Sequence, residues 1–175
     1  MEQVIPAEFE NRWPVWIECA KRLLCDGDPY IPQSIENLGI AERMLLQMET
    51  DLKSESRKQV RDALLSECSA HSILWVFGLY EVLRKVREMK IAQHGQLERL
   101  FQKLEVIRMP LAKHEVKSAP QYRKKLYYPT SVWSLENGWV GWHVFNPVSE
   151  TNEVFYRTEL ANEFLTITAI TQAES

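Results

Sequence analysis

Apolar residues recur at every third or fourth position over the first two thirds of the chain, which is the spacing that lines one face of an α-helix. The stretches that show it are residues 9–24, 34–52, 56–89 and 96–108. The third stretch is the longest, and its middle, Ile73 to Tyr80, is apolar all round. We therefore expect this helix to be buried on several sides within a bundle.

Prolines and capping residues predict where these helices begin and end. Pro14 suits the first turn of a helix, so the first helix is expected to begin only one or two residues before it. Residues 26–32 are rich in turn formers and predict a loop, after which Ser34 is the expected N-cap of the second helix. Pro110 is expected to kink or end the fourth helix, because it cannot donate a backbone hydrogen bond.

The last third of the chain changes its periodicity and predicts β-structure. The expected strands are residues 132–136 and 139–145. Asn137-Gly138 between them is a strong signal for a two-residue hairpin turn, because both turn positions tolerate positive φ. Such a turn pairs Trp133 with Trp142 and Leu135 with Val140, and it gathers these side chains on one apolar face.

After the hairpin, Val154 to Tyr156 is expected to return as a third strand. Thr158 is the expected N-cap of a short helix that carries Leu160 and Phe164, and the residues after Ile167 are expected to form a frayed tail.

These elements predict a mainly α fold. Residues 1–118 are expected to form a four- to five-helix bundle. Residues 119–175 are expected to add a basic connector, a small antiparallel β-hairpin or meander (about 131–156) and the short terminal helix, docked on the bundle as one unit.

Composition and charge exclude several classes of protein. The chain has 175 residues, 45% of them hydrophobic, and a net charge of −3, which excludes a disordered chain and counts against a globally basic nucleic-acid binder. Its longest uncharged apolar run, Ser72 to Tyr80, is far shorter than the ~20 residues of a membrane-spanning helix. Three cysteines without a paired spacing and no secretory signal predict a cytoplasmic protein with no membrane partner.

The familiar catalytic and metal-binding motifs are absent from the sequence. No Gly-rich phosphate loop, G-x-S-x-G elbow or H-E-x-x-H helix occurs. Cys68 and His71 lie three residues apart with Glu67 nearby, but a zinc site needs further ligands, so the favoured interpretation is a core cysteine beside a hydrogen-bonded histidine. No metal and no cofactor is therefore predicted.

The segment from Arg108 to Glu115, RMPLAKHE, carries one family resemblance. It resembles the motif of the HEPN superfamily, in which an Arg precedes a His by a few residues. These are helical-bundle proteins that include many metal-independent ribonucleases of bacterial toxin and defence systems. The resemblance implies a dimeric enzyme in which Arg108 contacts a phosphate and His114 transfers a proton at the RNA 2′-hydroxyl. An Arg stabilises phosphate charge and an imidazole titrates near neutrality, so the residue types suit this chemistry.

Two alternatives stay open beside this resemblance. Arg87 and His94 have a similar spacing, so such a pair also arises by chance. Arg108 and His114 can equally pair with carboxylates or cap the ends of helices.

Basic and aromatic residues are interleaved around and after this motif. Cations that neutralise phosphates beside rings that stack on bases are typical of single-stranded nucleic-acid binding, so RNA is a candidate partner. A solvated linker whose rings pack on the bundle is the alternative. The candidate contact residues are Lys113, Lys117, Tyr122, Arg123, Lys124 and Lys125.

The chain has six tryptophans, and three of them belong to the predicted hairpin. Trp133 and Trp142 are expected to seat the sheet on the helices. Trp139 falls on the opposite face and is the candidate for contact with a protein partner.

No complete catalytic constellation can be assembled from these residues. The sequence therefore favours a small regulatory or interaction protein, either a homodimer or bound to a protein partner. The alternative is an HEPN-like ribonuclease or RNA-binding protein that uses Arg108 and His114.

Overall fold

The computed structural model describes residues 7–23, 28–89, 95–113, 129–147 and 149–170. Within these ranges the chain forms five helices and one three-stranded antiparallel sheet, with strand order β1-β2-β3. The elements are α1 (Ala7–Arg22), α2 (Tyr30–Ser54), α3 (Lys58–Glu88), α4 (Gly95–Lys113), β1 (Thr130–Trp133), β2 (Val140–Asn146), β3 (Thr151–Tyr156) and α5 (Arg157–Ile170). The prediction of a mainly helical fold with a small antiparallel sheet is confirmed.

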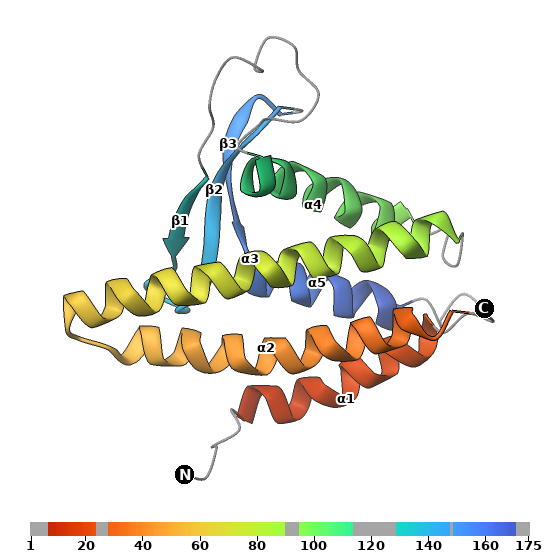
Figure 1. Ribbon diagram of the computed structural model, residues 1–175, viewed down its shortest axis with the longest axis horizontal. Helices are drawn as coiled ribbons and strands as arrows, with labels where there is room; N and C mark the ends of the chain where they lie inside the picture. Colours follow the sequence, from red (N-terminus) through yellow and green to blue (C-terminus); the bar gives the residue numbers. More distant parts are fainter. Residues whose placement is uncertain (1–6, 24–27, 90–94, 114–128, 148, 171–175) are drawn as a thin grey trace.

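The helices α2 and α3 are two long antiparallel rods that lie side by side (Figure 1). The helix α1 packs on α2, and α5 contacts α1 and α4. The sheet stands beside α4 and contacts α3 through β1 and β2 (Figure 1). None of the helices within the described ranges combines the length and the apolar content needed to cross a membrane.

A cluster of charged side chains joins α1, α2 and α5 inside the molecule. The Arg157 guanidinium is fully buried and donates hydrogen bonds to Glu42 (3.2 Å) and Glu49 (2.7 Å). Arg12 donates to both oxygens of Glu42, at 2.6 and 3.1 Å. Two carboxylates thus face two guanidinium groups, and this pairing offsets the cost of removing the charges from water. Burial by itself lowers the pKa of Arg157, but Glu49 and Glu42 outweigh it and the pKa is raised.

The helix α1 begins a full turn earlier than expected, so Pro14 lies in its interior and not in its first turn. The hydrogen bonds of its neighbours explain why the helix continues through the proline. Arg12 before Pro14 and Trp16 after it both bind the carboxylate of Glu42, with Trp16 Nε1 donating to Glu42 Oε2 at 2.5 Å. These tertiary contacts hold both halves of the helix against α2 and offset the local cost of the proline, about 3 kcal/mol.

The N-cap predicted at Ser34 is wrong. The helix α2 begins at Tyr30, and the carboxylate of Asp28 accepts a hydrogen bond from the Tyr30 backbone N–H at 2.9 Å. Pro32 then lies in the first turn, where a missing N–H costs nothing.

Pro110 does not end the fourth helix as expected, because α4 runs on to Lys113. The Pro110 side chain is buried, and Leu111 beside it packs against the hydrophobic core. Burial of these side chains stabilises the helix beyond the proline.

The predicted register of the hairpin is also wrong, by two residues. Trp133 lies opposite Val140, and Trp142 lies opposite Ser131. The loop is longer than a two-residue turn, since Ser134 and Trp139 close it through a hydrogen bond from the Ser134 N–H to the Trp139 carbonyl. A shift of two residues keeps every side chain on its face.

Three of the predicted inward residues, Val140, Trp142 and Val144, are therefore still buried. Leu135 is the exception: it leaves the strand and is 78% exposed in the loop.

Gly138 explains the longer loop, because it docks the hairpin onto α2. Its φ is +77°, and a side chain built on it would lie 2.9 Å from the carbonyl oxygen of Glu49. The Glu49 side chain in turn accepts a hydrogen bond from the Val140 N–H at 3.2 Å. The hairpin geometry is thus set by contact with a helix distant in the sequence.

The third strand is present as expected, and α5 follows it directly at Arg157. Thr158 is therefore not the N-cap. Its hydroxyl donates to Glu49 at 3.1 Å, inside the charged cluster. The helix also extends beyond the predicted end at Ile167: Thr168 is buried, and its Oγ1 lies 2.7 Å from Cys19 Sγ of α1.

Candidate functional site

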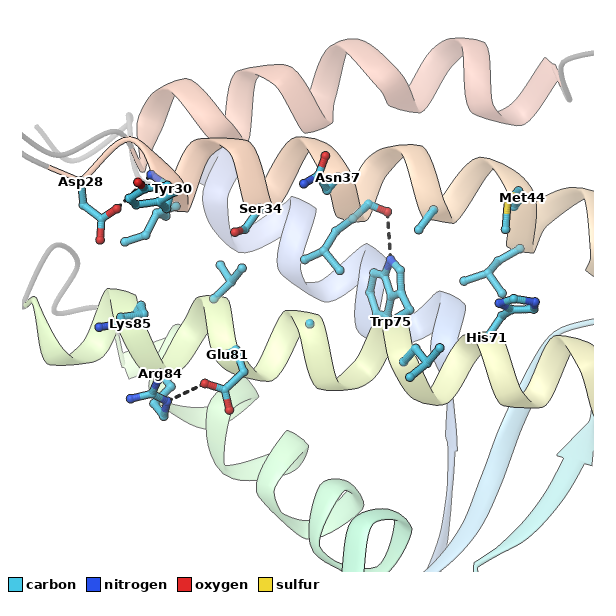
Figure 2. A pocket seen from close by; sticks show the side chains of 17 residues that line it. Asp28, Tyr30, Ser34, Asn37, Met44, His71, Trp75, Glu81, Arg84 and Lys85 are labelled. Carbon is cyan, nitrogen blue, oxygen red and sulfur yellow. Dashed lines mark hydrogen bonds and ion pairs between the residues drawn. The ribbon is translucent and has the colours of Figure 1, made fainter.

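A groove of about 730 Å³ runs between α2 and α3 on the outside of the molecule. Figure 2 shows its two ends: Asp28 and Tyr30 lie at the end near Lys85, and Met44 lies across from His71 at the other end. Seventeen residues line it, all of them on α2, on α3 or in the segment that leads into α2.

Small residues occupy the middle of the groove. Ala41 on α2 and Gly78 on α3 line this part. A Cβ at Gly78 would lie 3.0 Å from Leu38 Cδ2, so the two helices already approach closely at this point. The hollow is therefore a consequence of helix packing.

A fixed tryptophan contributes to the lining of the groove. Trp75 is almost fully buried, and its Nε1 donates a hydrogen bond to the carbonyl oxygen of Leu38 at 3.0 Å (Figure 2). The Trp16 ring packs edge-on against it, with 6.2 Å between the centroids. Since the hydrogen bond to Leu38 and the Trp16 ring fix the position of Trp75, this side of the groove is formed before anything binds there.

The rim of the groove is apolar and exposed. Tyr30 is 76% exposed, Leu74 is 66% exposed and Met44 is 51% exposed. Tyr30 and Met44 lie at opposite ends of the groove, so exposed apolar side chains mark its whole length (Figure 2). Leu74 has the most central position, between His71 and Gly78 on α3.

Charged residues gather at one end of the groove. Arg84 donates to Glu81 at 2.7 Å and also binds Glu88, while Lys85 lies 3.6 Å from Glu88. All four side chains are more than one third exposed, so water screens these pairs and they exchange partners at little cost. The groove thus offers apolar contacts, a few hydrogen bonds and mobile charges, a composition suited to binding a protein surface.

The structure describes only one residue of the proposed Arg–His pair. Arg108 lies in α4 with its guanidinium 4.5 Å from the centre of the Tyr80 ring, and it is half-buried there. His114 lies outside the described residues, so the pairing remains a prediction.

The same holds for most of the basic stretch. Lys113 is exposed at the end of α4. The remaining candidates lie outside the described residues: Lys117, Tyr122, Arg123, Lys124 and Lys125.

Trp139 is half-buried at the end of the hairpin loop, directly before β2. Its ring packs edge-on against Tyr156 of β3, with 6.2 Å between the centroids. It does not belong to the groove lining, and its contact with a protein partner remains a prediction.

Cys68 and His71 point into different surroundings. Cys68 is fully buried in the core, and burial raises the pKa of its thiol to about 12. His71 lines the groove instead. Across the described parts of the chain, no three His, Cys, Asp or Glu side chains converge as a metal site would require.

Sequence reasoning missed Leu74 and Met44 as surface residues. The stretch Ile73 to Tyr80 is apolar all round, and this pattern predicted burial on several sides. The expectation is wrong for Leu74, which is exposed. The sequence nevertheless contains an indication of this exposure. The apolar surface of residues 73–80 is wider than the neighbouring helices can cover, and an uncovered apolar face indicates a binding surface.

Comparison of the chain with family models, curated proteins and solved structures gave no match.

Proposed function

We propose that this protein is a non-enzymatic interaction module that binds a protein helix in the groove between α2 and α3. The observation that carries the proposal is the exposure of Leu74 on the rim of a groove that Trp75 helps to line. Leu74 is 66% exposed, so a covering partner would recover part of the about 1.5–3 kcal/mol that full burial of a leucine contributes.

The dimensions of the groove favour a helix as the bound element. Its lining runs from His71 to Lys85 along α3, which is ~21 Å at 1.5 Å per residue. An amphipathic helix of about four turns spans this length, with apolar residues at heptad positions facing Leu74 and Met44.

The buried charged cluster supports a structural interpretation over a catalytic one. Arg157, Glu42 and Glu49 are sealed from solvent and satisfied by each other. They fasten α2, which forms one wall of the groove, to α5 and offer no access to a substrate.

The proposal is tested with a synthetic helical peptide that carries Leu at heptad a and d positions. We expect its addition to shift the NMR signals of the Met44 and Leu74 methyl groups, and Leu74→Asp to abolish the binding. Leu135→Asp is the matched control, because Leu135 is also largely exposed, at 78%, but lies in the hairpin loop. Equal loss of binding in both variants, or no shift in the wild type, would sink the proposal.

The ribonuclease implied by the Arg108–His114 resemblance gives a different result in a separate assay. An HEPN-like enzyme cleaves a mixed RNA substrate in EDTA and loses this cleavage in His114→Ala. Under our proposal neither protein cleaves the RNA.

A further inference from the structure

The exposed face of α3 carries a stripe with a regular spacing. Its members alternate at steps of four and three residues, so they lie along one face of the helix. They are Glu67, His71, Leu74, Gly78, Glu81 and Lys85. The last five line the groove, and exposed Glu67 continues the stripe by one turn.

This stripe is complementary to itself when the helix is reversed about the midpoint between Leu74 and Gly78. In that antiparallel arrangement the two central layers place Leu74 of one copy against Gly78 of the other. The Leu74 side chain then lies over Gly78, which has no side chain of its own and is flanked by Leu38 of α2. Antiparallel coiled coils require this pairing of unlike positions in each layer.

The charged positions of the stripe obey the same symmetry. The next layers place His71 of one copy against Glu81 of the other, and an imidazole N–H can donate to a carboxylate whether or not the ring is charged. The outermost layers place Glu67 against Lys85, which are opposite charges. In a parallel arrangement in register, each charged residue would instead face the same residue of the other copy, and the like charges would repel.

We infer that the occupant of the groove is a second copy of this chain, bound through an antiparallel α3–α3 contact with its two-fold axis between Leu74 and Gly78. This inference rests on the proposed function, because it names the partner of the same groove. A two-fold axis makes every contact occur twice, so one complementary stripe supplies both halves of the interface.

The area available predicts a weak dimer. The stripe is ~27 Å long, and two adjacent helices present a width of ~20 Å, which gives on the order of 500 Å² for each copy. Specific interfaces begin near a total of about 1,000 Å², so the contact lies at the low end of that class. We expect a dissociation constant on the order of micromolar.

A charge-exchange experiment tests both the partner and the register. Sedimentation equilibrium is measured over a wide range of concentrations for the wild type, Glu67→Lys and Lys85→Glu. Each single variant places like charges against each other twice, and we expect the dissociation constant to rise about tenfold. An equimolar mixture of the two variants restores both attractive pairs, so we expect it to recover wild-type affinity. Thermal unfolding of each variant establishes that these exposed substitutions leave the fold intact.

Two outcomes would overturn the inference: a wild-type protein that stays monomeric, or a mixture that associates no better than its components. Titration of the wild type with the Leu-heptad peptide then tests the proposed function separately. Peptide binding by a monomeric protein preserves the groove as an interaction site for another protein. If the protein neither forms a dimer nor binds the peptide, both proposals are wrong.

Discussion

Arg157 Nη2 and Glu49 Oε2 lie 2.7 Å apart, although 108 residues separate them in the sequence. Arg157 is fully buried and Glu49 nearly so, and Glu42 supplies the second carboxylate of the cluster. The pair fastens α5 to α2, which forms one wall of the groove. The position of that wall therefore depends on a residue from the far end of the chain.

The first prediction concerns removal of this guanidinium. Arg157→Met leaves two buried carboxylates with one fewer partner, and we expect it to lower the free energy of unfolding by about 3–5 kcal/mol. Urea titration measures the change. Arg57→Met is the matched control, because the Arg57 side chain is 74% exposed and water screens its pair with Glu55, so we expect little change. A loss of similar size in both variants contradicts the assignment.

The second prediction concerns the contact between α1 and α2 at Gly39. A Cβ there would lie 2.8 Å from Trp16 Cγ, and Trp16 cannot retreat because it is buried and bound to Glu42. Gly39→Ala adds about 1 kcal/mol of helix propensity, but we expect overpacking to outweigh it and to destabilise the protein by about 1–3 kcal/mol. Gly95→Ala, where a Cβ meets open space, should be neutral or stabilising in the same urea titration.

The third prediction distinguishes the observed hairpin register from the two-residue turn. Leu135→Ala should change the free energy of unfolding by less than about 0.5 kcal/mol, because Leu135 is exposed in the loop. Leu160→Ala removes the same atoms from the buried face of α5 and should cost about 2–5 kcal/mol. If Leu135→Ala were as costly as Leu160→Ala, the register Trp133–Val140 would be incorrect.

The fourth prediction concerns alkaline pH and Cys68. Burial raises the pKa of this thiol to about 12, whereas a thiol in an unfolded chain ionises near pH 8.5. The stability that the protonated thiol contributes is complete below about pH 8.5 and is lost as the pH rises toward 12.

We therefore expect the stability difference between the wild type and Cys68→Ala to shrink from about pH 8 to about pH 11. Unfolding free energies of both proteins across this range provide the measurement. A difference that stays constant would show that the thiol titrates alike in the folded and unfolded states.

The sequence predicted some elements closely because their information is local. The helix α3 was expected over residues 56–89 and occupies Lys58–Glu88, since a long periodic stripe needs no knowledge of its neighbours. The hairpin register was not predictable in this way. Its loop is fixed by the approach of Gly138 to the backbone of Glu49, a contact between distant segments.

The candidate site, too, was predictable from the sequence only where the information is local. The apolar residues of the groove were visible in the sequence, but which side of α3 stays uncovered depends on where α4 and the sheet pack. The charged cluster was invisible as well, because Glu42 and Glu49 look like the polar face of an ordinary amphipathic helix. That face of α2 is buried only because α5 packs against it.

The late position of Arg157 in the sequence has a consequence for biosynthesis. Residues emerge from the ribosome in order, so the carboxylates of Glu42 and Glu49 are made more than a hundred residues before the guanidinium that neutralises them. Until then, closing α1 over α2 would bury two acids against the single cation of Arg12. We therefore expect this part of the core to close only after α5 has been synthesised and has packed against α2.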